Sequence, residues 1–201
     1  SNSIVADRLA LKIADYVVTE AGFASDLGFQ KFCDIVCRFG GFSPSAAVLV
    51  TTVRAIKSHG GKAVQDLGAE DQDALRRGAE NLAAHVQIVK TYGVPCVVAI
   101  NGFPTDTLAE TALMRELALE AGAETVVVHT GFSDGGCGSM ELAKAVVTAC
   151  EKPNTFKQLT PDGTPIVQQI EAIATKVYGA AGIELDAAAK KDLERMEKLG
   201  L

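Results

Sequence analysis

Residues 96–106 have the sequence Cys-Val-Val-Ala-Ile-Asn-Gly-Phe-Pro-Thr-Asp, and they carry most of the information on the fold. Residues 96–100 form an unbroken apolar run, which is typical of a central parallel strand buried on both faces. Thr107 then begins an amphipathic helix that we expect to reach Ala121, with Glu110 as its capping-box partner. The polar residues between strand and helix therefore follow the carboxyl end of a strand, where open α/β sheets bind ligands.

Apolar segments alternate with helical patterns along the rest of the chain. We expect strands near Tyr16–Thr19, Ala46–Thr52, Cys96–Ile100 and Thr125–His129. We expect helices near Ser3–Lys12, Gly28–Arg38, Glu70–Tyr92, Thr107–Ala121, Ser139–Cys150, Pro165–Tyr178 and Asp186–Leu199. This alternation predicts an α/β fold, with a parallel sheet of about four strands, right-handed crossovers and helices on both faces. It also suggests a βα half domain over 1–152 and a helical extension over 153–201.

Composition narrows the classes of function. A chain of 201 residues that is 48% hydrophobic can bury one sizeable core. Its net charge of −6 argues against nucleic acid or an anionic membrane surface as the main partner. No apolar run approaches the ~20 residues of a membrane span, and no secretory leader is recognisable. The five cysteines lack the spacing of a zinc site, so we expect a cytoplasmic protein with reduced thiols.

Several long motifs resemble one enzyme family. Residues 101–107, Asn-Gly-Phe-Pro-Thr-Asp-Thr, resemble the Asn-x-Phe-Pro-Thr-Asp-Thr signature of formate–tetrahydrofolate ligase. Residues 15–23, Asp-Tyr-Val-Val-Thr-Glu-Ala-Gly-Phe, are similar to that family's most recognisable motif, and residues 52–57 and 173–180 match in the same order. The resemblance implies an ATP-dependent ligase of one-carbon metabolism, with a fold like that of P-loop nucleotide hydrolases.

The reaction that the resemblance implies joins formate to tetrahydrofolate through formyl phosphate and gives 10-formyltetrahydrofolate. ATP and magnesium are the implied cofactors, tetrahydrofolate is a substrate, and a monovalent cation is a further implied requirement. The implied partners are these small molecules rather than nucleic acid or membrane. The resemblance also suggests a homo-oligomer, or a chain that needs the rest of the parent enzyme.

This chain differs from the family in two respects. Members of the family are much longer, and their phosphate-binding glycine loop precedes the matching region, whereas no Gly-x-x-x-x-Gly-Lys-Ser/Thr pattern occurs here. Asp134 also stands where the family usually has Lys, while Phe132 replaces Trp and Cys137 replaces Glu. We therefore expect an internal piece of the nucleotide-binding domain that is inactive alone. The alternative is a non-catalytic module that docks to a partner or binds nucleotide weakly.

The first candidate group of site residues lies after the strand expected at Tyr16–Thr19. Glu20 stands at the end of this strand, and Gly22 follows two residues later. Because glycine has no side chain, the backbone at Gly22 can come close to a phosphate group. Carboxylates in this position suit magnesium and phosphoryl transfer, so we assign catalytic roles to Glu20 and Asp26. Glu20 is the candidate metal ligand, directly or through water. The alternative for Asp26 is helix capping.

The second group follows the strand expected at Ala46–Thr52. Thr52 is a candidate nucleotide contact, and Arg54 is a candidate catalytic residue. The guanidinium of Arg54 and the ammonium of Lys57 suit the oxygens of phosphate or formyl phosphate. A solvated basic turn is the alternative.

The last two groups follow the strands expected at Cys96–Ile100 and Thr125–His129. Polar side chains in the first loop can bond the edge of a purine or its ribose, and an aromatic ring in the second can stack on adenine. A polar loop that only caps its helix is the alternative for the first. The candidate cofactor-binding residues are Asn101, Phe103, Pro104, Thr105, Asp106, Phe132 and Ser133.

Overall fold

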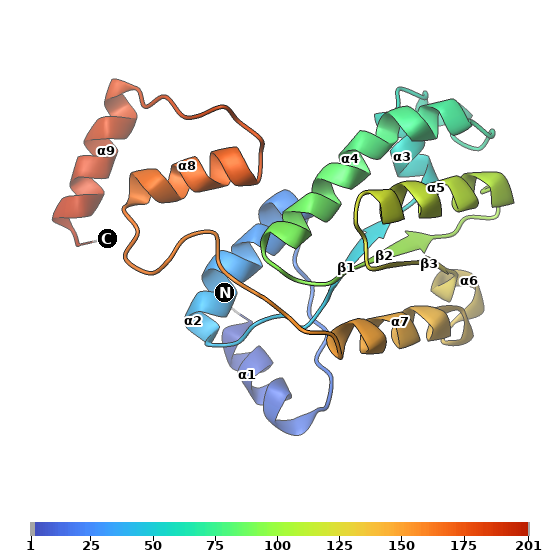
Figure 1. The fold of residues 1–201 in the computed structure, drawn as a ribbon, viewed down its shortest axis with the longest axis horizontal. Coiled ribbons are helices and arrows are strands. Elements are labelled where there is room, and N and C mark those ends of the chain that lie inside the picture. The colour runs from blue at the N-terminus through green and yellow to red at the C-terminus, as the bar shows by residue number, and fades with distance from the viewer. Residues whose placement is uncertain (1–2, 201) are drawn as a thin grey trace.

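A parallel sheet organises the fold. The computed structural model describes residues 3–200. Strands β1 (Ala47–Thr51), β2 (Cys96–Asn101) and β3 (Thr125–His129) pair in the order β1-β2-β3, all parallel (Figure 1). The predicted α/β class is confirmed, and so are these three strands, with β2 reaching one residue beyond the expected end.

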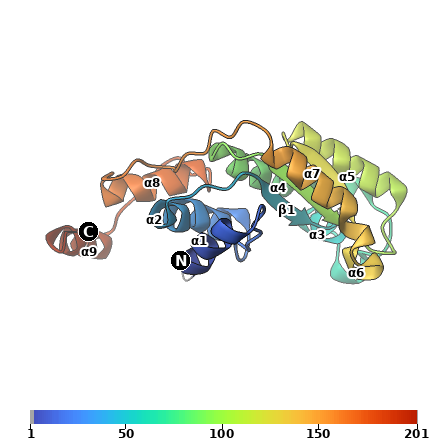
Figure 2. The ribbon, with the colours of Figure 1, turned by 90° about the horizontal axis from the view of Figure 1, so that it is seen from below.

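Helices cover both faces of this sheet (Figures 1 and 2). Helices α3 (Val53–His59), α4 (Gln72–Thr91) and α5 (Leu108–Glu120) lie on one face, and α7 (Met140–Cys150) lies on the other. Side chains alternate along a strand, so Val98 and Ile100 join the core under α4 and α5 while Val97 and Ala99 face α7. Burial on both faces explains why residues 96–100 are all apolar.

The strand predicted at Tyr16–Thr19 is wrong. Residues 14–24 contain neither helix nor strand, and Tyr16 and Val18 are 54% and 92% exposed. No backbone N–H of residues 15–24 donates to another backbone group within the described chain. A strand requires a neighbour to accept its hydrogen bonds, and this segment has no such neighbour. An apolar run is therefore insufficient by itself to predict a strand.

The segments that flank this stretch are helical. Helix α1 (Ile4–Ile13) precedes it, and two π-helical turns, η1 (Ser25–Phe29) and η2 (Phe32–Cys37), lead into the short α2 (Arg38–Gly40). These turns occupy most of the region predicted as one α-helix over Gly28–Arg38. Short helical turns also occur at η3 (Val64–Asp66), α6 (Gly131–Asp134) and η4 (Cys137–Ser139).

Two helices and their linker follow the sheet. Helix α8 (Ile166–Lys176) contributes to the common core through Ile173, whereas α9 (Ala187–Lys198) buries no residue and lies at one end of the molecule (Figure 2). The Asp34 carboxylate accepts hydrogen bonds from the backbone N–H of Leu159 at 2.9 Å and from the Tyr92 hydroxyl at 2.8 Å. The linker is thus tied to the body, and a domain boundary at residue 152 stays a prediction. Among the described helices, none has the length and apolar character required to span a bilayer.

Candidate functional site

The candidate site begins at the carboxyl edge of the sheet. Asn101 ends β2 and pairs in register with His129, which ends β3. Thr52 directly follows β1, and its Oγ1 accepts a hydrogen bond from the Ala55 N–H at 2.9 Å as the cap of α3. The sheet therefore brings Thr52, Asn101 and the loop that contains Phe132 to one edge, as the positions of these three strand ends predict. Glu20, the fourth residue expected to follow a strand, follows none.

Residues 101–107 form the Asn101 loop, and Asp106 holds its turn. Asp106 Oδ2 accepts a hydrogen bond from the Phe103 N–H at 2.8 Å, and the Asp106 N–H donates to the Phe103 carbonyl at 2.9 Å. Asp106 Oδ1 is buried without a hydrogen-bond partner in the described structure. Burial, together with repulsion from Glu110, raises the pKa of Asp106 despite the opposing Phe103 amide. The site therefore contains a desolvated acceptor that a ligand N–H would satisfy.

Arg54 joins the second candidate group to the Asn101 loop. Its guanidinium carbon lies 5.3 Å from the centroid of the Phe103 ring, which is cation–π geometry. Arg54 is half-buried and Phe103 is exposed, and within residues 3–200 the Arg54 guanidinium makes no hydrogen bond or ion pair. The donors of Arg54 are therefore free to bind an anion beside the loop.

Lys57 is buried and does not reach an anion site. Its Nζ lies 2.8 Å from Glu110 Oε1, both side chains are fully buried, and Nζ also donates to the Ala69 carbonyl at 3.0 Å. The same carboxylate accepts hydrogen bonds from the N–H groups of Asp71 at 3.0 Å and Thr107 at 3.2 Å. The proposed phosphate contact for Lys57 is therefore wrong, because the ammonium is used to anchor the base of the Asn101 loop.

Glu110 has two roles at the start of α5. Thr107 Oγ1 accepts from the Glu110 N–H at 3.1 Å, so the predicted capping box is confirmed. Burial alone would raise the pKa of Glu110, but the Lys57 ammonium and the two backbone N–H groups outweigh it and hold the pKa below its ordinary value. The ion pair was not predictable from the pattern, because Lys57 and Glu110 lie far apart in sequence.

His129 is a site residue that the sequence analysis missed. Its Nδ1 lies 3.0 Å from Asn101 Oδ1, and its Nε2 lies 3.0 Å from Ser139 Oγ. The available signal was its position at the end of the strand next to that of Asn101.

The two candidate residues of the loop after β3 are placed as follows. Phe132 is fully exposed, and the Ser133 hydroxyl donates to the Thr130 carbonyl at 3.1 Å.

Glu20 and Asp26 lie in a different structural setting. Glu20 is exposed within residues 14–24, and Asp26 is partly buried at the start of η1. No described hydrogen bond or ion pair joins either carboxylate to Thr52, Asn101 or Phe132. Residue 23 of this loop is a phenylalanine with a φ of +70°, a left-handed conformation that is uncommon for a bulky residue, and its side chain is 94% exposed.

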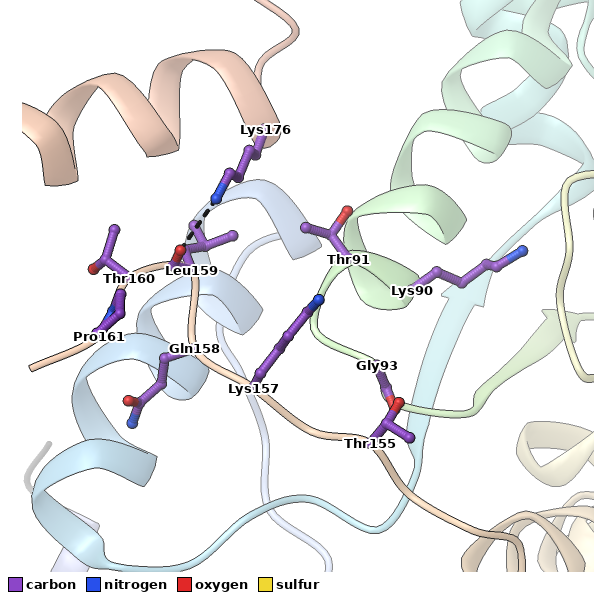
Figure 3. Close-up of a pocket in the computed structure, with 10 residues that line it drawn as sticks. All are labelled: Lys90, Thr91, Gly93, Thr155, Lys157, Gln158, Leu159, Thr160, Pro161 and Lys176. Carbon is purple, nitrogen blue, oxygen red and sulfur yellow. Dashed lines mark hydrogen bonds between the residues drawn. The ribbon is translucent and has the colours of Figure 1, made fainter.

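A separate cleft of about 990 Å³ lies at the opposite edge of the sheet, where α4 ends and the chain turns into β2 (Figure 3). Lys90, Lys157 and Lys176 line it, but Lys90 points away from the other two lysines. The Lys176 ammonium already donates to the Leu159 carbonyl at 3.2 Å. The cleft therefore does not focus its three cations on one point, and the carboxyl edge remains the candidate site.

Potential metal ligands are dispersed. No group of three or more His, Cys, Asp or Glu side chains is arranged to hold a metal ion within the described part of the chain. All five cysteines are free, and burial raises the pKa of the Cys37 and Cys96 thiols to about 12. A metal at this site would therefore need ligands from bound phosphate or water besides a single carboxylate.

The geometry defines an α/β protein with a parallel sheet, and the candidate ligand site lies at the carboxyl edge of that sheet. The family model described as formate–tetrahydrofolate ligase matches residues 1–201. The chain is 47% identical over 209 residues to the formate–tetrahydrofolate ligase of Desulforamulus reducens, covering 100% of this chain and 37% of that protein. It is 48% identical over 200 residues to the formate–tetrahydrofolate ligase of Symbiobacterium thermophilum, covering 99% and 36%.

This chain belongs to the formate–tetrahydrofolate ligase family. It spans little more than a third of the length of these two relatives.

Proposed function

We propose that this chain forms part of the nucleotide and formyl-transfer site of an ATP-dependent formate–tetrahydrofolate ligase. The observation that carries the proposal is the meeting of Thr52, Asn101 and the Phe132 loop at one sheet edge, with Arg54 stacked on Phe103. This edge combines an anion-binding cation, hydrogen-bonding groups and exposed aromatic rings, in a chain whose family performs this reaction.

In the proposed reaction, a formate oxygen attacks the γ-phosphorus of ATP, and ADP leaves. N10 of tetrahydrofolate then attacks the carbon of formyl phosphate, and inorganic phosphate leaves as 10-formyltetrahydrofolate forms. Arg54 would bind the phosphate oxygens and stabilise the charge that develops on them. The protein contributes mainly orientation and electrostatics, as is general for phosphoryl transfer.

The remaining edge residues would bind the adenine and ribose. Asn101 and Asp106 offer hydrogen bonds to a ring edge, and the rings of Phe103 and Phe132 offer stacking surfaces. The other members of this proposed set, which add apolar contact or a hydroxyl group, are Thr52, Pro104, Thr105 and Ser133.

The carboxylates of the Glu20 segment fit magnesium in their chemistry. Magnesium prefers oxygen ligands and binds proteins through one or two carboxylates, with water and phosphate completing its shell. An exposed Glu20 suits such a role, directly or through water, and Asp26 is the second candidate. Bound magnesium would neutralise charge on the phosphates. A monovalent cation is a further proposed requirement, taken from the family resemblance.

We further propose that the chain acts in the cytoplasm, within a homo-oligomer or with the remaining parts of the enzyme. Its acidic charge and free thiols agree with this setting. Because the 201 residues contain no phosphate-binding glycine loop, the chain alone would not sustain catalysis. A second candidate function is a non-catalytic module that docks to a partner or binds nucleotide weakly. Asp134 favours it, because a carboxylate repels phosphate.

A coupled assay with ATP, formate and tetrahydrofolate tests catalysis, and calorimetric titration with magnesium–ATP and with tetrahydrofolate tests binding. We expect no useful turnover by the 201-residue chain and measurable binding that Arg54→Ala or Asn101→Ala weakens. Lys190→Ala, on the exposed helix α9, is the control and should bind as the unmodified chain does. Absence of binding by the unmodified chain would favour the docking module, and clear turnover would refute the expected inactivity.

A further inference from the structure

We propose that His129 is a positioning residue that determines which side of the Asn101 amide faces the ligand. This inference rests on the proposed function, because it concerns the same edge of the sheet. It adds a residue that none of the sequence motifs identified, and it predicts the kind of ligand atom that Asn101 recognises.

The hydrogen-bond chemistry of the pair defines the arrangement. Asn101 Oδ1 lies 3.0 Å from His129 Nδ1, and a carbonyl oxygen can only accept. Nδ1 must therefore carry the hydrogen and donate it to Oδ1. Because Oδ1 is turned toward the ring, the amide presents its Nδ2–H₂ group on the side away from His129.

Ser139 stabilises this tautomer from the other side of the ring. His129 Nε2 lies 3.0 Å from Ser139 Oγ, which also lies 3.4 Å from the Gly135 carbonyl oxygen. A ring that carries its hydrogen at Nδ1 accepts the single hydroxyl hydrogen at Nε2, over the shorter of these two distances. The main chain of residue 129 is fixed as well, since the Gly102 N–H donates to the His129 carbonyl at 3.0 Å. The imidazole is thus held between the end of β2 and the start of α7.

Gly131 leaves the space that this arrangement needs. A Cβ atom on Gly131 would lie 2.5 Å from His129 Nε2 and 2.6 Å from Ser139 Oγ. Such distances are too short for any side chain, so a residue other than glycine would displace the histidine or the serine. The hydrogen-bonded row Asn101–His129–Ser139 therefore depends on a glycine placed directly against it.

The orientation has a consequence for recognition. On the side away from His129, the Asn101 amide offers N–H donors, so a ligand that approaches from that side is selected for acceptors such as a purine ring nitrogen or a ring carbonyl oxygen rather than for an exocyclic amino group. Rotation of the amide by 180° would reverse this preference. His129 thereby contributes to ligand choice without contacting the ligand.

Two replacements of His129 distinguish the contribution of Nδ1 from that of Nε2. His129→Asn retains a donor near the position of Nδ1 and removes the contact with Ser139. His129→Gln retains a group near the position of Nε2 and removes the donor to Asn101. We expect His129→Gln to weaken magnesium–ATP binding about tenfold and His129→Asn to change it by less than about twofold, as measured by calorimetry.

Nitrogen-15 NMR of the imidazole rings provides a readout that needs no ligand. The chain has three histidines, so each replacement identifies the signals of residue 129. We expect the Nδ1–H tautomer in the unmodified chain. An Nε2–H tautomer would overturn the proposal, because Asn101 would then have to donate to the ring.

The two measurements distinguish the possible failures. If the unmodified chain does not bind magnesium–ATP, the proposed function fails, and the tautomer alone decides the role of His129. If it binds but both variants lose affinity equally at unchanged thermal stability, the positioning role is refuted. Equal loss together with lowered melting temperatures in both variants also contradicts it, since a purely structural histidine predicts that result.

Discussion

The Glu20 segment (residues 14–24) and the Asn101 loop (residues 101–107) both carry motifs of the family, yet the structure holds them very differently. The Asn101 loop follows a paired strand, contains its own Asp106 turn and rests on the buried Lys57–Glu110 ion pair. The Glu20 segment has no backbone hydrogen bond from residues 15–24 within the described chain and exposes Val18 and Phe23 almost completely.

The difference shows that a motif becomes a preorganised site only when its backbone groups have partners. The sheet supplies these partners to the Asn101 loop through β3 on one side and α5 on the other. The Glu20 segment is attached near its end, where the Ser25 hydroxyl lies 2.6 Å from His85 Nδ1 and η1 packs against Gly22. We therefore expect the two regions to respond differently to substitution.

The largest effect should come from breaking the ion pair beneath the Asn101 loop. Lys57→Met leaves the buried Glu110 carboxylate without its cation, so we expect the free energy of unfolding to fall by about 3–5 kcal/mol. Denaturant unfolding measures this change. Lys57→Met combined with Glu110→Leu should recover part of the loss, because no unpaired buried charge remains, whereas the Asp71 and Thr107 N–H groups lose their acceptor. Glu20→Gln is the matched control in the other region, and a comparable loss there would contradict the comparison.

A smaller effect should follow from adding a side-chain atom where η1 touches the backbone of the Glu20 segment. A Cβ on Gly28 would overlap the Gly22 carbonyl, so Gly28→Ala should destabilise the fold by about 1–3 kcal/mol through overpacking. Gly22→Ala meets no atom within 4 Å and has no positive φ, so it should be close to neutral. Thermal unfolding of both variants tests the pair, and equal effects would argue against this attachment.

Ser25→Ala should have a further reduced effect. The substitution removes the hydroxyl that bonds His85 and should cost about 1 kcal/mol, the usual value of one intramolecular hydrogen bond. Hydrogen exchange should show faster exchange of the η1 amides in the variant, with the amides of α5 unchanged. Residues 15–24 should exchange rapidly even in the unmodified chain, and strong protection there would show that the segment has partners after all.

The smallest effect should come from Asp106→Asn, which we expect to stabilise the fold by an amount that depends on pH. Because burial raises its pKa in the folded state, the folded protein binds this proton more tightly than the unfolded chain, and stability is lost as the pH rises above 3.8. Asp106→Asn removes that loss and can still accept from the Phe103 N–H. The stabilisation of the variant should therefore grow between pH 3.5 and pH 7, as followed by denaturant unfolding at each pH. The same increment at both ends would contradict the assigned cause.

Local sequence patterns predicted much of the fold correctly. The apolar run at 96–100, the Thr107–Glu110 capping box and the βα alternation after residue 46 depend on neighbours in sequence, and all were confirmed. The strand expected at Tyr16–Thr19 failed because pairing depends on another segment. The phosphate contact expected of Lys57 failed for a related reason, since its partner Glu110 lies on a different helix.

The sequence by itself determined the family and the parallel α/β class, and it predicted the edge of the candidate site, because motifs and periodicity are local properties of the chain. Only the tertiary structure decided which polar side chains remain available there. In the tertiary structure Lys57 is buried against Glu110, and His129 lies between Asn101 and Ser139. Asp106 Oδ1 is buried without a hydrogen-bond partner among the described residues. The physical reason is that desolvation and hydrogen bonding depend on atoms brought together from distant positions, and no local pattern specifies those neighbours.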